Sequence, residues 1–211
     1  MDTFENKKVL YIMVLERILK KYLSENFRGR MMESSNTSIK TIDIVQISLM
    51  AAIIYIATYL IKVPVGNKAV FHIGDSMVYL SALLLGKKKG VIAAALGMTL
   101  FDLSTPWFYW APFTLIIKGG MAYITAMIAY RKGYKADNLW NNLFAFIVAG
   151  VWMVFGYFLS GLVVYKLTTN NVLLAFVDIP PNIGQVIVGI ALALPLSLTL
   201  VKYNKNHGFI N

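Results

Sequence analysis

Three ionisable side chains stand inside or at the edges of segments that are otherwise apolar enough for lipid: Asp75, Asp102 and Lys118. A charge at the centre of a membrane helix costs about 2.5–3.5 kcal/mol on insertion scales, so such residues indicate either a functional role or a buried partner. Two carboxylates and an ammonium group could supply charge for binding a polar solute. The alternative is a structural ion pair in which Asp75 or Asp102 neutralises Lys118.

Polar residues accompany these charges at helical spacing, so that each set shares one helix face. The stripes are His72, Asp75 and Tyr79; Thr99 and Asp102; Thr114, Lys118 and Thr125; and Asn182, Gln185 and Gly189. We expect a pocket for a small polar or aromatic solute, with Asn182 and Gln185 giving amide hydrogen bonds and Trp107 and Trp110 a flat stacking wall. Simpler roles stay open: a helix cap for Asn182, a helix start stabilised by the dipole for Asp75, and interface anchoring for the tryptophans.

Catalysis and autonomous energy coupling find little support in the residues present. The chain has no cysteine, two distant histidines, and none of the motifs GxSxG, HExxH or GxxxxGK[ST]. We therefore expect no enzyme, no metal site and no cofactor. A membrane-embedded enzyme using His72, Asp75 and Asp102 would have a poor catalytic inventory. A transporter built on this chain would take its energy from an ion gradient or from other subunits.

Six apolar segments would position these residues. The 211-residue chain is 58% hydrophobic and 14% charged, whereas soluble domains average about a quarter charged. This predicts an all-α integral membrane bundle of six helices. The segments are residues 42–61, 71–85, 90–103, 113–130, 143–165 and 183–203. The second and third are short, so they are tilted spans or a pair that does not fully cross.

Basic residues between the segments predict the orientation and account for the net charge of +10 without nucleic acid. One side carries Lys40, Lys87, Lys88, Lys89, Arg131, Lys132, Lys135, Lys202 and Lys205; the other carries Lys62, Lys68 and Lys166. Both termini are therefore expected in the cytoplasm, and the polar stripes meet at the outer side. Residues 1–39 form a separate basic extension, expected to be an amphipathic helix on the membrane or a poorly ordered arm, ahead of a membrane domain at residues 40–211.

An ordered set of motifs also resembles a known family. It comprises Gly74-Asp75, LLGKKKG at residues 84–90, Gly97, FDL at 101–103, APFTLIIKG at 111–119, and Pro181-Asn182 with Gln185. The set is similar to the substrate-binding S components of energy-coupling factor (ECF) transporters, which take up vitamins in bacteria and archaea. It covers about residues 39–203 and is closest to the riboflavin-type group, which includes subunits assigned to hydroxymethylpyrimidine or pyridoxine-type substrates.

The resemblance implies a multi-pass protein of the bacterial cytoplasmic membrane that binds one vitamin at its extracellular side. It also implies a complex with a transmembrane coupling subunit and two ATPase subunits, which use ATP to topple the loaded S component. Family members contact the coupling subunit through small residues of the first helix, here Ser48, Ala51 and Ala52. From spacing alone, packing within the chain's own bundle is the alternative for this strip.

The expected substrate-binding residues are therefore Asp75, Tyr79, Asp102, Trp107, Trp110, Thr114, Lys118, Asn182 and Gln185. The compact polar set and the many aromatic residues favour a small heteroaromatic B vitamin or precursor, of the pyridoxine or hydroxymethylpyrimidine kind, over riboflavin. Riboflavin remains the first alternative. The second is a structural membrane protein without a transport role, in which the polar stripes are internal pairs.

Overall fold

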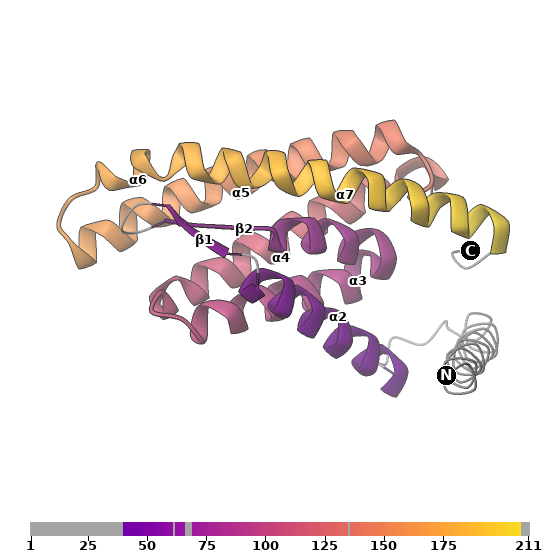
Figure 1. Cartoon of the computed structure of the whole chain (residues 1–211), viewed down its shortest axis with the longest axis horizontal. Helices are drawn as coiled ribbons and strands as arrows, with labels where there is room; N and C mark the ends of the chain where they lie inside the picture. Colours follow the sequence, from indigo (N-terminus) through magenta and orange to yellow (C-terminus); the bar gives the residue numbers. More distant parts are fainter. Residues whose placement is uncertain (1–39, 61, 66–68, 135, 208–211) are drawn as a thin grey trace, which may run out of the picture. The chain divides into compact units, whose positions relative to one another are not determined.

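The computed structural model describes residues 40–60, 62–65, 69–134 and 136–207 (Figure 1). The predicted extension at residues 1–39 lies outside the described residues. The elements in chain order are α2 (Thr41–Leu60), β1 (Lys62–Val65), β2 (Ala69–His72), α3 (Gly74–Leu103), the short 3₁₀ helix η1 (Phe108–Trp110), α4 (Ala111–Ala129), η2 (Arg131–Gly133), α5 (Leu139–Thr168), α6 (Leu174–Val177) and α7 (Ile179–His207).

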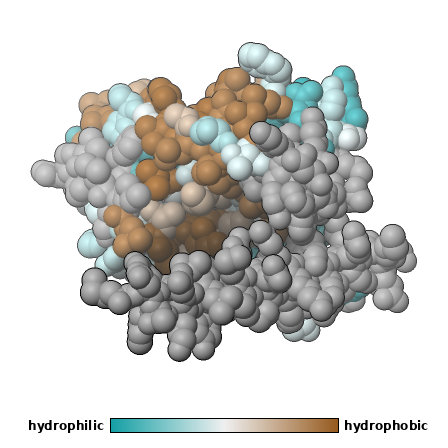
Figure 2. Space-filling model, turned by 45° about the vertical axis from the view of Figure 1, so that its right-hand side comes forward, coloured by the Kyte–Doolittle hydropathy of each residue, from teal (hydrophilic) through white to brown (hydrophobic). Residues whose placement is uncertain are grey.

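The described helices carry their apolar side chains outward as well as inward. Within the part of the chain that the structure describes, four segments are long and apolar enough to cross a membrane: Thr41–Leu60, Phe108–Ala129, Leu139–Thr168 and Leu174–Thr199. Figure 2 shows hydrophobic residues over most of the coloured part of one face, with hydrophilic residues gathered towards one edge. A helix satisfies its own backbone hydrogen bonds, so an apolar exterior suits hydrocarbon. The expectation of a mainly helical, multi-pass membrane protein is confirmed; the count of six spans and the cytoplasmic termini stay predictions.

One short β-hairpin departs from the expected all-helical fold. β1 pairs with β2 in antiparallel register, with Lys62 opposite His72, where the sequence predicted a loop followed by a helix from residue 71. The helix begins later, at Gly74. Valines at positions 63, 65 and 70 favour extended backbone, and proline is tolerated at a sheet edge. His72 therefore ends a strand, and the prediction that it shares a helix face with Asp75 and Tyr79 is wrong.

The helix α3 reverses direction at Gly86, as the predicted turn at residues 86–90 requires. Gly86 has φ 71° and ψ −167°, a conformation open in practice to glycine alone. The Ser81 hydroxyl donates to the carbonyl oxygen of Gly90 at 3.2 Å, although nine residues of straight helix would separate them by about 13 Å. Residues 74–85 and 87–103 are thus two antiparallel segments.

These two segments lie at the centre of the bundle. α3 packs against α2, α4 and α7, and α5 packs against α4 and α7. Small side chains let the helices approach closely: a Cβ on Gly97 would lie 2.7 Å from the Ala51 carbonyl oxygen of α2. Tyr79 and Phe146 fill the middle of the core with ring centroids 4.5 Å apart. The result is a packed interior with buried polar groups at both ends, among them Asp75, Asp102 and Lys118 at one end and Asn141 and Asn142 at the other.

The reversal predicts that Gly90 tolerates no side chain. A Cβ there would lie 2.5 Å from the backbone oxygen of Ser81, so Gly90→Ala must push the two segments of α3 apart. We expect a loss of about 1–3 kcal/mol, typical of overpacking, seen as a lower melting temperature in detergent.

Gly119→Ala in α4 is the matched control. Its Cβ would meet its nearest neighbour, the Cβ of Ala95, at 3.5 Å, an ordinary contact. Alanine also has the higher helix propensity, so this variant should match or exceed the wild-type melting temperature. Equal melting temperatures for Gly90→Ala and the wild type would show that the close approach at Gly90 does not limit stability.

Candidate functional site

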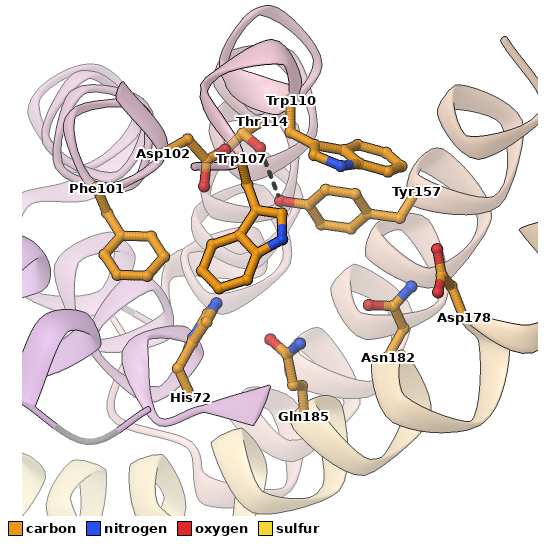
Figure 3. Close-up of a pocket in the computed structure, with 10 residues that line it drawn as sticks. All are labelled: His72, Phe101, Asp102, Trp107, Trp110, Thr114, Tyr157, Asp178, Asn182 and Gln185. Carbon is orange, nitrogen blue, oxygen red and sulfur yellow. Dashed lines mark hydrogen bonds between the residues drawn. The ribbon is translucent and has the colours of Figure 1, made fainter. Parts of the chain in front are cut away.

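A pocket with a volume of about 90 Å³ opens where the ends of several elements meet (Figure 3). It lies at the C-terminal end of α3 and the N-terminal ends of α4 and α7. The predicted orientation assigns this end of the bundle to the outside. The lining residues are His72, Phe101, Asp102, Trp107, Trp110, Thr114, Tyr157, Asp178, Asn182 and Gln185.

The ends of the helices hold the lining residues in place through local hydrogen bonds. α3 stops just after Asp102, whose backbone oxygen accepts from the hydroxyl of Thr105 at 2.9 Å. The chain then turns through η1, which carries Trp110, and Pro112 stands in the first turn of α4, a position where its missing N–H costs nothing. Asn182 donates its backbone N–H to the Asp178 carbonyl oxygen at 3.1 Å in the first turn of α7.

Two buried polar atoms at the pocket have no hydrogen-bond partner among the described residues. They are Oδ2 of Asp102, whose residue is 9% exposed, and Nδ1 of His72, whose residue is 7% exposed. Burial lowers the pKa of His72 to about 4, so the imidazole is neutral at pH 7. Buried polar groups in native proteins are nearly always paired, with protein, water or ligand. These two atoms are therefore open to a hydrogen bond from water or a solute in the pocket.

Aromatic rings form the pocket's apolar walls. The Trp110 ring makes edge contacts with Tyr157 and Tyr165, with centroids 6.0 and 5.8 Å apart. The Tyr157 hydroxyl lies 3.1 Å from that of Thr114 (Figure 3). Tyr165 in turn donates to Asp178 Oδ2 at 2.5 Å. This arrangement offers flat surfaces for a planar ring, with carboxylate and amide groups at its edges.

The buried ion pair lies beneath this pocket. The Lys118 ammonium donates to Asp75 Oδ1, and both residues are fully buried. Nζ of Lys118 also lies 5.3 Å from the centroid of the Tyr157 ring, close enough for a cation–π interaction. The structure thus pairs Lys118 with Asp75, one of the two partners that the sequence left open.

Six of the nine predicted substrate-binding residues line the pocket: Asp102, Trp107, Trp110, Thr114, Asn182 and Gln185. Asp75, Tyr79 and Lys118 are not among its lining residues. The Tyr79 hydroxyl donates to the Phe146 carbonyl oxygen at 2.9 Å, so this side chain belongs to the core. Asp75 and Lys118 are paired with each other, and their part in substrate binding stays a prediction.

Sequence reasoning missed three lining residues and misplaced a fourth. Phe101 and Tyr157 are aromatic residues in apolar segments, where a lipid-facing ring gives the same pattern. Tyr157 does stand eight residues before Tyr165, a spacing that keeps both on one helical stripe. Asp178, an acid just before Pro180-Pro181, was the clearest unused signal. His72 was noticed, but on the wrong element.

The small residues Ser48, Ala51 and Ala52 of α2 differ in their exposure. Ser48 and Ala52 are exposed, whereas Ala51 is only 5% exposed and faces Gly97 of α3. Ala51 is thus buried where the backbones of α2 and α3 approach closely, and the prediction that this strip contacts another subunit stays a prediction. Ser48 and Ala52 remain available to a partner.

Comparisons with known proteins agree with this description. The family model for the ECF-type riboflavin transporter, S component, matches residues 38–202. A thiamine precursor transporter, HmpT of Lactococcus lactis, is 27% identical over 82% of this chain and 95% of its own length. An uncharacterised protein in the gap 3′ region of Pyrococcus woesei is 32% identical over 52% of this chain and 72% of its own length. A solved S component of a bacterial ECF transporter has a similar fold, with a TM-score of 0.62 at 20% identity over 77% of this chain and 97% of that one.

The ion pair yields a stability prediction. Lys118→Met removes the cation and leaves Asp75 as an uncompensated buried carboxylate, which typically costs about 3–5 kcal/mol. We expect a strongly lowered melting temperature in detergent. The double variant Lys118→Met with Asp75→Asn removes both charges and should recover most of the loss.

The pair between Lys89 and Asp43 is the control. Its atoms are 3.1 Å apart, but the side chains are 33% and 25% exposed, and partly exposed pairs contribute about 0–1 kcal/mol. Lys89→Met should therefore shift the melting temperature little. If Lys118→Met were no more harmful than Lys89→Met, the buried pair would not support the pocket.

Proposed function

Because the chain belongs to the family of ECF-type riboflavin transporter S components, we propose that it captures a small heteroaromatic vitamin or vitamin precursor at the outer side of the bacterial membrane. The observation that carries this proposal is the pocket at one end of the bundle, with aromatic walls and two unpartnered buried polar atoms, Asp102 Oδ2 and His72 Nδ1. All ten lining residues fall within the matched range. The binding residues proposed are those that line this pocket.

The size of the pocket supports a one-ring solute. Sites for drug-sized ligands occupy about 300–1,000 Å³, whereas this pocket has about 90 Å³. A pyrimidine or pyridine with short substituents suits such a space better than the three fused rings and ribityl chain of riboflavin. The similarity to a thiamine precursor transporter over most of both chains also favours a hydroxymethylpyrimidine. Riboflavin, which the family description names, is the alternative.

The same proposal includes partners that supply energy. The sequence contains no GxxxxGK[ST] phosphate loop, so ATP hydrolysis would belong to two ATPase subunits joined to the chain through a transmembrane coupling subunit. The exposed Ser48 and Ala52 of α2 would let a partner helix approach closely. Toppling of the whole six-span bundle would then turn the loaded pocket towards the cytoplasm.

Ligand identification tests the binding function. Protein purified in mild detergent should retain or bind a small heteroaromatic vitamin, detected by native mass spectrometry and by titration with 4-amino-5-hydroxymethyl-2-methylpyrimidine, pyridoxine and riboflavin. Asn182→Ala should weaken binding roughly 10-fold or more, as expected for one lost hydrogen bond, without lowering the melting temperature of the unliganded protein. The absence of binding across the panel would refute the proposal.

A second test concerns the coupling surface. Ala52→Leu enlarges an exposed small residue of α2, so it should reduce co-purification with a coupling subunit while leaving ligand affinity unchanged. Ala191→Leu, at an exposed alanine of α7, makes the same change outside the strip and should have no effect. Equal recovery of the complex with both variants would move the interface away from Ser48 and Ala52.

A further inference from the structure

The charges around the pocket narrow the chemistry of its ligand. Resting on the proposed function, we infer that the pocket recognises an amidine edge, a ring nitrogen beside an amino group, through Asp102, and that it rejects phosphate esters of the same ring. This inference assigns Asp102 as the residue that determines specificity. Recognition by Asp102 would distinguish ligands of similar size that differ in the hydrogen-bonding groups on the ring.

The lining has acidic groups and no cationic side chain. Among its ten described residues, Asp102 and Asp178 are carboxylic acids and none is lysine or arginine. The nearest buried cation, Lys118, lies outside the lining and is engaged by Asp75. A phosphate dianion in this space would face two carboxylates without a counter-charge, and desolvating an unpaired charge is costly. The pocket therefore favours a neutral or cationic solute.

The position of Asp102 determines which edge of the solute it meets. Its Oδ2 is buried and has no partner among the described residues, and its side chain lies beside Thr114 across the pocket from Gln185 (Figure 3). A ligand that leaves this oxygen unpaired forms no hydrogen bond with it, and the complex then bears the cost of keeping a buried acceptor away from water. A bound solute should therefore present a hydrogen-bond donor here.

A 4-aminopyrimidine meets this requirement. Its amino group donates one hydrogen bond, and the adjacent ring nitrogen shares one proton with the carboxyl group. The pair exists either as carboxylate with amidinium or as carboxylic acid with neutral amidine, and the proton balance is the same. Hydrogen bonds of this charge-assisted kind are roughly twice as strong as neutral ones. The aromatic walls at Phe101, Trp107 and Tyr157 suit the flat ring.

An oxo group in place of the amino group removes one of the two donors. The 4-oxo analogue keeps a ring N–H but turns a carbonyl oxygen, an acceptor, towards Asp102, and the imide edge of riboflavin places two carbonyl oxygens around a single N–H. Against the ionised carboxylate of Asp102, each places oxygen lone pairs against an anionic oxygen. A binding site built around a specific donor rejects analogues that lack it far more strongly than an apolar site does. Asp102 would thus separate aminopyrimidines from pyrimidinones and flavins.

The test compares ligands and variants in one titration, using the change in tryptophan fluorescence expected from Trp107 and Trp110 at the pocket. The ligands are 4-amino-5-hydroxymethyl-2-methylpyrimidine, its 4-oxo analogue, its phosphate ester, pyridoxine and riboflavin. The variants are Asp102→Asn, which keeps the shape and removes the charge, and Asp43→Asn, which removes a carboxylate from the α2–α3 contact at Lys89, a residue outside the pocket lining.

The wild type and Asp43→Asn should bind the aminopyrimidine at least ~100-fold more tightly than the 4-oxo analogue and the phosphate ester. Asp102→Asn should lose ~10- to 100-fold for the aminopyrimidine and bind the 4-oxo analogue better than the wild type does. Two results would overturn the inference while the binding function stands. In the first, the wild type binds riboflavin, pyridoxine or the phosphate ester as tightly as it binds the aminopyrimidine. In the second, Asp102→Asn binds the aminopyrimidine with the same affinity as the wild type. Failure of all five ligands to bind the wild type would overturn both.

Discussion

The buried pair between Lys118 and Asp75 is the constraint on which the rest of the pocket end depends. It joins α4 to the first segment of α3, with both side chains inaccessible. Either charge alone would be strongly unfavourable in this interior, so the two helices must stay together. The ammonium also lies against the ring of Tyr157, which ties α5 to the same point. The pair therefore forms a rigid support with no net charge, and the residues above it line the pocket.

Above that support, the pocket is assembled mainly from the ends of elements, and Tyr157, in the middle of α5, adds one wall. β2 contributes His72, α3 ends at Asp102, α4 begins near Thr114 and α7 begins near Asn182. Each end is held by short-range contacts, such as the Tyr165 hydroxyl on Asp178. Side chains at such junctions come from five or more separate segments, so a small site can present charge, amides and flat rings together. The family match and the fold likeness fit this construction.

The sequence predicted the membrane class, the turn at Gly86 and most of the pocket lining. It could not show how far below the pocket each polar residue of a helix face lies. A stripe of polar residues defines a helix face, and Thr114 and Lys118 do share one; four residues along a helix still amount to about 6 Å. This rise along α4 separates Thr114, which lines the pocket, from Lys118, which does not. The hairpin was not predicted because proline and glycine, here Pro64 and Gly66, are typical of loops. Tyr157 was missed because a ring in an apolar span has the same pattern whether it faces lipid or a cavity.

The reversal of α3 at Gly86 has a consequence for the surrounding bilayer. The second segment of α3, residues 87–103, rises only about 26 Å along its axis, against a hydrocarbon thickness of about 30 Å. In a bilayer, lipid beside the exposed Leu96 and Leu100 would have to thin, or Lys87 and Lys88 would have to extend their stems towards the headgroups, and such hydrophobic mismatch costs fractions of a kcal/mol per Å. A neighbouring protein with an equally short surface would relieve that deformation. The short second segment of α3 would thereby create a lipid-mediated attraction towards a matching neighbour, independent of any side-chain contact.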